Sequence, residues 1–528
     1  ELLYQHGLPP QATYLFKHAL IQDTAYQSLL KSKRQQLHQQ IATVLETQFL
    51  DTKETQPELL AHHYTEANQI EQAIPYWLQA GQSAARRSAN VEAISHFTKG
   101  LAVLNTLPET LDRAQQELTL QLALGVSLLA TRGYTVPEVG NAYSRARELC
   151  QQIGETPELF SVLTGLHRFY TARAEHQTTH ELAERILTLA QKAQDPDLLL
   201  GAHLVMGGSS WLGEFVPSRV HLQQAMTLYN PQQHSALAFV YGVDFGIVYS
   251  AVAFSLWYLG YPDQALRNSE KAITLIRELA HPHSLALALH YACWIRQYRR
   301  ESPATQKRAG ELIMLANEQG FPFLLAWGTM YRAWALAQQG QEEEGIRHIR
   351  QGLAAARAMG AGVGVPYWLA LLSELYGKTG QIEEGLSLLT EALTLVDKTE
   401  ERFYEAELYR LKGTLTLQSQ ASPGQVKTSQ DKSEDTAPRP LTPDPQGEAE
   451  ACFLKAIEIA QKQQAKSLEL RASTSLARLW QQHGKRTEAH TLLSEVYNWF
   501  TEGFDTKDLQ EAKALLEELW IPYEKKET

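Results

Sequence analysis

Cysteine is scarce in this chain of 528 residues: it occurs three times, as Cys150, Cys293 and Cys452, which lie far apart. At that spacing neither a disulfide framework nor a zinc site can be built. The chain also opens without the apolar run of a signal peptide. We therefore expect a reducing, cytoplasmic setting and no metal site.

Positive charge is in the minority. The 48 Lys and Arg residues are outnumbered by 59 Asp and Glu residues, which leaves a net charge of −11. Because contacts to phosphate need clustered cations, we expect no nucleic-acid partner. Three short basic runs, which end at Arg34, Arg87 and Arg300, are interpreted as solvated helix faces.

Long uncharged segments are rare as well. Residues 235–262 carry a single charge, Asp244, and are long enough to cross a bilayer. Their Gly and Ser content and their place in a repeat favour a buried helix pair instead. We therefore expect no membrane segment.

Catalytic signatures are missing too. Residues 377–379 (Gly-Lys-Thr) resemble the end of a phosphate-binding loop, but Leu372 stands where that motif needs a glycine. The His180-Glu181 pair lacks the second histidine of a zincin helix. The His62-His63 pair is interpreted as packed or solvated rather than metal-binding. We expect neither enzyme activity nor a cofactor in this chain.

What the chain does contain is a repeated helix pair. Residues 245–272 are predicted to form two helices, with small side chains such as Ala253 and Ala265 where the helices touch. Gly260 can close the first helix because glycine tolerates a left-handed backbone. Pro262 suits the first turn of the second helix, where its missing N–H costs nothing.

Turn glycines set the length of the repeat. They fall at Gly213, Gly260, Gly340, Gly380 and Gly484; 40 residues separate Gly340 from Gly380, and 80 separate Gly260 from Gly340. This period exceeds the roughly 34 residues of the tetratricopeptide repeat (TPR). The unit between Gly260 and Gly340 lacks its glycine. We predict an all-α, right-handed, TPR-like superhelical solenoid of about ten helix pairs.

The ends of the array and one interruption are also predicted. Residues 12–30 and 34–49 have the pattern of two amphipathic helices, and TPR-like repeats then span 51–418. Residues 419–447 contain five prolines and no aromatic residue, so we expect a disordered insertion between the two helices of one repeat. Residues 448–528 would hold the final repeats and a helix over 507–519, capped by Asp505 or Thr506, that covers the open end.

Spacing places small and aromatic residues in TPR-like roles. Near the start of the array, Ala61, Tyr64, Ala73, Trp77 and Ala80 match the TPR pattern. In a TPR unit the first helix lines the concave groove, and counting back from the turn glycines predicts seven aromatic groove residues: Trp211, Phe254, Trp257, Tyr258, Trp327, Trp334 and Tyr367.

Those seven rings have two interpretations. They suit a binding surface, because aromatic side chains offer a large contact area at low entropic cost. The alternative is that a tight superhelix packs them against neighbouring helices. If they bind, alanine at Trp257 and Trp334 should weaken partner binding without unfolding the array.

Several stretches resemble a family of large bacterial signalling proteins. They are residues 16–30 (FKHALIQDTAYQSLL) with 34–46 (RQQLHQQIATVLE), residues 57–81 (PELLAHHYTEANQIEQAIPYWLQAG), residues 259–266 (LGYPDQAL) and residues 497–519 (YNWFTEGFDTKDLQEAKALLEEL). In that family a class III adenylate/guanylate cyclase domain often precedes an AAA-like ATPase of the STAND type and a C-terminal TPR array.

The resemblance implies that the chain is a piece of a longer protein. Residues 1–50 would be the end of a winged-helix-like segment that links the ATPase to the repeats. The cyclase and Walker motifs would lie upstream of Glu1, so the family's catalytic residues have no positions here. The array would be a protein- or peptide-binding sensor arm whose occupancy biases the ATPase switch.

Two other functions stay open. One is a small-molecule effector site inside the superhelix, and the other is an oligomerisation scaffold. A wet, partly charged groove would favour peptides, whereas a closed aromatic pocket would favour a small effector. Neither the partner nor the oligomeric state follows from the sequence.

Overall fold

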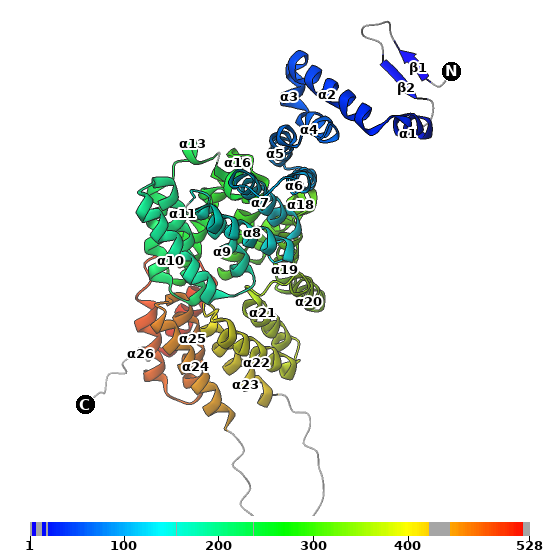
Figure 1. The fold of residues 1–528 in the computed structure, drawn as a ribbon. Helices are drawn as coiled ribbons and strands as arrows, with labels where there is room; N and C mark the ends of the chain where they lie inside the picture. Colours follow the sequence, from blue (N-terminus) through cyan, green and yellow to red (C-terminus); the bar gives the residue numbers. More distant parts are fainter. Residues whose placement is uncertain are drawn as a thin grey trace, which may run out of the picture. The chain divides into compact units, whose positions relative to one another are not determined.

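The structure is a computed structural model that describes residues 3–6, 13–16, 19–154, 156–235, 237–421 and 444–520 (Figure 1). The chain divides into two compact units. The first holds residues 1–127 and 145–156, and the second holds residues 128–144 and 157–528. Nearly all elements in the described part of the chain are helices.

The first unit begins with a hairpin, in which β1 (Leu3–His6) pairs antiparallel with β2 (Thr13–Phe16). The predicted helix over 12–30 is therefore wrong in its first third. Threonine, tyrosine and phenylalanine suit a pleated strand, and β1 supplies the hydrogen-bonding partner that one amphipathic pattern could not reveal. Six helices follow: α1 (Ala19–Ser28), α2 (Lys31–Gln48), α3 (Leu50–Thr55), α4 (Pro57–Glu66), α5 (Ile70–Arg86) and α6 (Asn90–Leu104). Helices α7 (Leu111–Arg132) and α8 (Pro137–Ile153) contain residues of both units.

The predicted TPR pattern forms the core of the first unit. All five of its residues are buried, on α4 and α5. Next to them Glu46 accepts hydrogen bonds from the hydroxyls of Tyr64 and Tyr76, which joins α2 to both helices. These two hydroxyls hold the pKa of the Glu46 carboxyl below its usual value. Spacing of small and aromatic residues thus identified this helix pair correctly.

In the second unit consecutive helices pack against each other along most of the array. In order the elements are α9 (Leu159–Ala172), α10 (His176–Ala193), α11 (Pro196–Met206), η1 (Gly207–Leu212), α12 (Phe215–Leu228), α13 (Pro231–His234), α14 (Leu237–Tyr241), η2 (Phe245–Ile247), α15 (Val248–Tyr258), α16 (Pro262–Glu278), α17 (Pro282–Tyr298), α18 (Ser302–Gln319), α19 (Pro322–Ala337), α20 (Glu342–Ala358), α21 (Val365–Lys378), α22 (Ile382–Thr399), α23 (Glu405–Ala421), α24 (Pro445–Lys462), α25 (Lys466–Gln482), α26 (Arg486–Tyr497) and α27 (Lys507–Leu519). The exception is that α12 packs on α15 rather than on the short helices α13 and α14. Among the described helices, none combines the length and the apolar character that crossing a membrane requires.

The turns keep the predicted period. All five turn glycines have left-handed backbones, with φ between 77° and 90°. In the unit without a glycine, the same place is taken by Arg300, which lies 40 residues from both Gly260 and Gly340 and has φ of 59°. The repeat therefore preserves the conformation of its turn even where the residue that favours it is absent.

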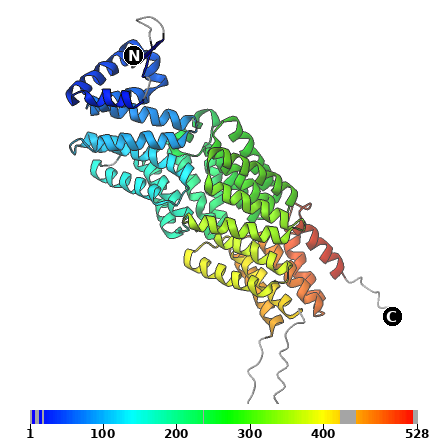
Figure 2. The same ribbon diagram turned by 90° about the vertical axis from the view of Figure 1, so that its right-hand side faces the viewer.

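The second unit winds back on itself, so that segments far apart in sequence touch. The amide of Gly362 donates to the carbonyl of Ala172, 190 positions earlier, and the amide of Arg402 donates to that of Trp211, 191 positions earlier. The hydroxyl of Ser467 likewise donates to the carbonyl of Trp257, 210 positions earlier. Figure 2 shows the orange and red helices beside the green and yellow ones. Each winding of the solenoid thus packs on the previous one.

The C-terminal helix covers the end of the array. Leu509, Ala512, Leu515 and Leu519 of α27 are buried against residues of α25 and α26, as predicted. Of the two predicted capping residues, Thr506 is the N-cap, but its side chain forms no capping hydrogen bond. Its hydroxyl donates to the carbonyl of Gly503, and Asp505 pairs with Arg299 instead.

The predicted insertion lies mostly outside the described residues, which stop at 421 and resume at 444. Helix α23 continues to Ala421 and α24 begins at Pro445, so the predicted limits of 419 and 447 are too wide. Helices α23 and α24 pack against each other, so the interruption falls between the two helices of one pair.

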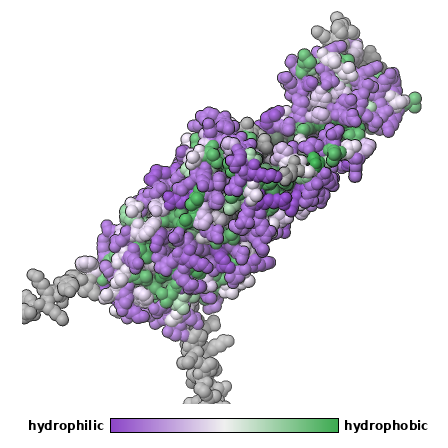
Figure 3. Space-filling view, turned by 60° about the vertical axis from the view of Figure 1, so that its left-hand side comes forward, coloured by the Kyte–Doolittle hydropathy of each residue, from purple (hydrophilic) through white to green (hydrophobic). Residues whose placement is uncertain are grey.

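On the face drawn in Figure 3, hydrophilic side chains predominate and hydrophobic ones form small patches.

Candidate functional site: a charged cleft beside an aromatic core

The seven predicted groove aromatics lie in the interior of the second unit. Trp211 is half-buried, and the six that are buried are Phe254, Trp257, Tyr258, Trp327, Trp334 and Tyr367. They pack mainly on other rings: Trp257 stacks on Tyr298 with ring centroids 4.2 Å apart, and Trp211 lies 5.8 Å from Phe254. Their place thus fits the packing interpretation, while contact with a partner stays a prediction.

Contacts between windings explain the burial of these rings. The guanidinium of Arg471 lies 5.0 Å from the centre of the Trp257 ring and comes from a helix more than 200 positions later. The hydroxyl of Tyr367 donates to the side-chain carbonyl of Gln297 at 2.8 Å. A register counted within one repeat cannot include these later helices, which cover the wall that would otherwise face a groove.

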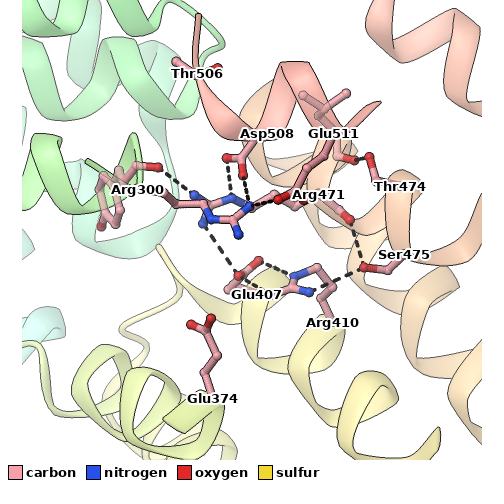
Figure 4. Close-up of polar contacts among 12 residues, drawn as sticks. Arg300, Glu374, Glu407, Arg410, Arg471, Thr474, Ser475, Thr506, Asp508 and Glu511 are labelled. Carbon is pink, nitrogen blue, oxygen red and sulfur yellow. Dashed lines mark hydrogen bonds and ion pairs between the residues drawn. The ribbon is translucent and has the colours of Figure 1, made fainter. Parts of the chain in front are cut away.

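A charged cleft of about 170 Å³ opens beside the aromatic core (Figure 4). Helices α17, α19, α21, α23, α25 and α27, with the turns after α17 and α19, supply its walls. Four arginines and four carboxylates line it: Arg300, Arg410, Arg471 and Arg478, with Glu374, Glu407, Asp508 and Glu511. Positive and negative groups are thus present in equal number.

Arg471 is the buried centre of this cleft. Its Nε donates to Oδ2 of Asp508 at 2.7 Å, and its Nη2 donates to the carbonyl of Tyr298 at 2.7 Å. Its Nη1 lies 3.6 Å from Oε1 of Glu407. Burial alone would lower the pKa of Arg471, but Asp508 and Glu407 hold that pKa well above its usual value. One side chain of α25 thereby ties together α17, α23 and α27.

Glu407 and Arg410 form a bidentate pair on α23. Arg410 donates from Nε to Oε2 at 2.9 Å and from Nη2 to Oε1 at 2.7 Å. Burial would raise the pKa of Glu407, but Arg410 and Arg471 hold it below its usual value. The carboxylate is therefore ionised at neutral pH, and paired charges of this kind give the cleft a fixed polar pattern.

The mouth of the cleft is less tightly paired. Arg300 donates from Nη1 to Oε1 of Glu511 at 2.8 Å and to Oδ1 of Asp508 at 3.3 Å. Arg478 lies 3.6 Å from Glu511 and is half exposed, and Glu374 contacts Lys378 of its own helix at 3.4 Å. Charges of both signs at the mouth suit a ligand that carries both hydrogen-bond donors and acceptors.

Sequence reasoning placed one residue of this cleft, Trp334, in a groove, but it missed the charged residues of the cleft and misjudged one basic run. The side chain of Arg299 is not solvated: the residue is 3% exposed and its guanidinium pairs with Asp263, Glu301 and Asp505. Since Arg300 occupies the turn position where its neighbouring repeats have glycine, the 40-residue period could have singled it out. The carboxylates come from distant helices, and no local pattern joins them.

The other motifs that were considered remain without a ligand set. In the part of the chain that the structure describes, no three His, Cys, Asp or Glu side chains are grouped to hold a metal ion. His63 lies with its Nδ1 2.7 Å from Nδ1 of His38, and His180 lies 3.5 Å from Glu184. Lys378 is the last residue of α21, at a helix–helix turn.

Comparison with known proteins gives one relative from sequence. No protein-family model matches the chain. An uncharacterized protein of Rhizobium meliloti (strain 1021) is 24% identical over 483 residues, which cover 89% of this chain and 44% of that protein. The chain thus spans less than half the length of this curated relative.

Solved structures resemble the chain in fold. A Rap protein complexed with competence and sporulation factor superposes with a TM-score of 0.50 at 9% identity, over 77% of this chain and 100% of that one. The chain is a TPR-like helical solenoid. The Cut9–Hcn1 hetero-tetramer of the APC/C superposes on this TPR-like solenoid with a TM-score of 0.46 at 12% identity, over 88% and 83% of the two chains. At such identities a likeness concerns the fold alone, and the superposition on the Rap protein confirms the predicted all-α repeat architecture.

Proposed function

We propose that this solenoid is a non-catalytic arm that binds a protein or peptide partner at the charged cleft. The observation that carries this proposal is the balanced set of four arginines and four carboxylates on the cleft wall. A peptide offers amides, carbonyls and side chains of both charges, so it can pair with such a pattern. The Rap protein of similar fold is complexed with a factor named for competence and sporulation.

Nucleic acid is a poorer candidate for the same cleft. Each arginine there faces a carboxylate, and the chain as a whole carries a net charge of −11. A phosphate backbone would meet repulsion from Glu374 and Glu511 at the mouth and would release few counterions. The proposed partner is therefore polypeptide.

In the longer protein, the arm would regulate an upstream STAND ATPase or nucleotide cyclase in a bacterial cytoplasm. The sequence resemblance supports this proposal, and so does the length of the Rhizobium relative, of which this chain spans 44%. The hairpin β1–β2 followed by α1 and α2 is compatible with the end of a winged-helix segment.

Coupling would act through the pairs that close the solenoid. Arg471 and Arg300 join α25 and α27 to the end of α17 and the turn after it, across separations of 173 to 211 positions. A partner that competes for Asp508 or Glu511 would weaken these links and loosen the packing of one winding on the next. Occupancy would thereby change the curvature of the arm. A ligand that binds one curvature better than another would bias the arm toward it.

Co-purification from native lysate, with mass spectrometry for proteins and small molecules, tests the proposal. The wild-type chain is compared with the double variant Glu374→Gln/Arg478→Gln, which alters the mouth but leaves the buried pairs intact. A matched control, Arg347→Gln/Glu384→Gln, removes the same charges from exposed positions on α20 and α22. We expect the cleft variant to lose a stoichiometric protein partner that the control retains; equal recovery by both would refute the cleft as the binding site.

A second candidate function is the sensing of a small-molecule effector, with an oligomerisation scaffold as a third. One observation favours the second candidate: the same unit contains a largely apolar cavity of about 230 Å³. A bound metabolite without a protein partner in the same experiment would support it. The scaffold would appear instead as self-association of the purified chain.

A further inference from the structure

An aromatic cavity of about 230 Å³ lies in the second unit, on the inner side of η1, α9, α15, α17 and α19. Aromatic rings form part of its wall, among them Trp211, Phe254, Tyr291, Phe323 and Trp327. It shares no lining residue with the charged cleft, and it stands independently of the partner-binding function proposed for that cleft. An apolar pocket with a few polar groups is the usual form of a small-molecule site.

One cation faces this apolar space without a counter-ion. Arg168 of α9 lines the cavity, and its Nη1 donates to the backbone carbonyl of Tyr241. Among the described residues no carboxylate forms an ion pair with it, and the groups that interact with its charge are tyrosines, Tyr143 first. An arginine stays charged under such conditions, and a partly buried cation is stabilised by an anion placed beside it.

Three ring nitrogens on the same wall have no hydrogen-bond partner within the described part of the chain. They are Nε2 of His167, Nδ1 of His290 and Nε1 of Trp327, on residues that are 8%, 7% and 2% exposed. The indole N–H can only donate, and a buried donor without an acceptor is costly. A ligand with acceptor oxygens would satisfy it.

The hydroxyl of Tyr134, which also lines the cavity, already donates a hydrogen bond within the protein. His283 must donate from Nδ1 to the carbonyl of Gly242, at 3.0 Å, because a carbonyl only accepts. Its Nε2 then accepts from the hydroxyl of Tyr134, also at 3.0 Å. The donors open to a ligand include the Arg168 guanidinium and the Trp327 indole, and both favour an anion or a carbonyl oxygen.

We propose that this cavity binds a small aromatic carboxylate, with its ring among the cavity's aromatic side chains and its carboxylate against Arg168. The size agrees: a cavity of about 150 Å³ takes up benzene, so the volume here suits one ring with a short acid side chain. Aromatic walls hold a planar ring by offset and edge-to-face contacts. The guanidinium supplies the directional charge-assisted pair.

Calorimetric titration of the 528-residue chain tests the ligand class with three probes of similar shape. Benzoate and phenylacetate carry the acid, 2-phenylethanol is neutral, and phenethylamine is cationic. We expect saturable binding of at least one acid at one site per chain, about ten- to hundredfold tighter than the alcohol, which is the range for a charged hydrogen bond. If neither acid reaches saturation, or if acid and alcohol bind with equal affinity, the proposal is overturned.

Two variants and two controls locate the site. Arg168→Gln should remove the preference for acid over alcohol. Gly208→Leu should abolish binding of both, because Gly208 lines the cavity and a larger side chain there would take up its space. The first carbon of that side chain meets His167 and Trp211 at 3.9 Å, which is ordinary contact. Arg185→Gln, on the exposed face of α10, removes the same charge elsewhere and should change nothing.

The outcomes separate this site from the cleft. Unchanged binding in a folded Gly208→Leu chain would place the acid elsewhere and refute the proposal, even if Arg168→Gln failed to fold. The cleft variant Glu374→Gln/Arg478→Gln should keep full affinity for the acid. If that variant lost the acid but kept its protein partner, both assignments would be wrong; if it lost the partner but kept the acid, both would stand.

Discussion

Arg300 has a strained, left-handed backbone, and its side chain forms ion pairs in the cleft. Replacing it separates the stabilisation by these ion pairs from the cost of the strain. Arg300 closes the turn between α17 and α18 with φ of 59°, whereas the turns 40 residues before and after it use glycine. Its guanidinium pairs with Asp508 and Glu511. Two substitutions separate these effects: alanine removes the ion pairs and keeps the strain, whereas glycine removes both.

The expected magnitudes follow from the two contributions. A left-handed backbone costs an L-residue about 1–2 kcal/mol. Glycine avoids this cost, but its greater freedom in the unfolded chain offsets about 0.5–1 kcal/mol of the gain. The two ion pairs are partly exposed and stabilise by about 0.2–1 kcal/mol each. We therefore expect Arg300→Ala to be about 1 kcal/mol less stable than the wild type and Arg300→Gly to lie above Arg300→Ala by about 0.5–1 kcal/mol.

Urea denaturation followed by tryptophan fluorescence measures this order. Ala280→Gly is the control: Ala280 is exposed, also has a left-handed backbone (φ of 50°), and closes the turn between α16 and α17. It should raise the free energy of unfolding by about 0.5–1 kcal/mol, which is the strain contribution alone. If Ala280→Gly stabilises but Arg300→Gly is no more stable than Arg300→Ala, the strain argument at Arg300 is refuted.

Three further predictions concern packing and pH. Gly165→Ala should destabilise the fold by about 1–3 kcal/mol, because the added methyl group would overlap the ring of Tyr143. Gly310→Ala in α18 should stabilise it by about 1 kcal/mol, because the added methyl group enters open space. Equal denaturation midpoints for the two variants would contradict this prediction. Burial lowers the pKa of His290 to about 3, so the contribution of this neutral ring to the free energy of unfolding is present above pH 6.5 and is lost as the pH falls toward 3. Between pH 7 and pH 5, His290→Phe should therefore lose about 2 kcal/mol less stability than the wild type. Parallel losses would argue against a neutral buried ring. Trp257 and Trp334 are each 2% exposed, so alanine at either should cost about 3–5 kcal/mol and lower the melting temperature; an unchanged melt with weakened partner binding would restore their role as groove residues.

Much of the fold was predictable because each repeat carries its own local signals. Positive-φ glycines such as Gly340 and Gly380, and small residues such as Ala265 at the helix contacts, encode a helix pair within about one period of 40 residues. The covering helix over 507–519 was predicted for the same reason, since its leucines recur at helical spacing. Where a partner strand mattered, as for β2, the local pattern misled.

The candidate site was hardly predictable, because its residues come from separate windings. Arg471 meets Tyr298 and Asp508 only after the solenoid has turned back on itself. Arg168 and Trp327 share a cavity although 159 positions separate them. No repeat contains both halves of either site.

The sequence by itself determined the helix pairs, their period of 40 residues and the order in which they stack. Only the tertiary structure decided that the aromatic wall is buried, that the charged cleft exists and that an aromatic cavity contains Arg168. The physical reason is geometric. Each repeat contacts its neighbours through a small rotation, and contacts between residues about 200 positions apart depend on the sum of these rotations over several repeats, which no single repeat encodes.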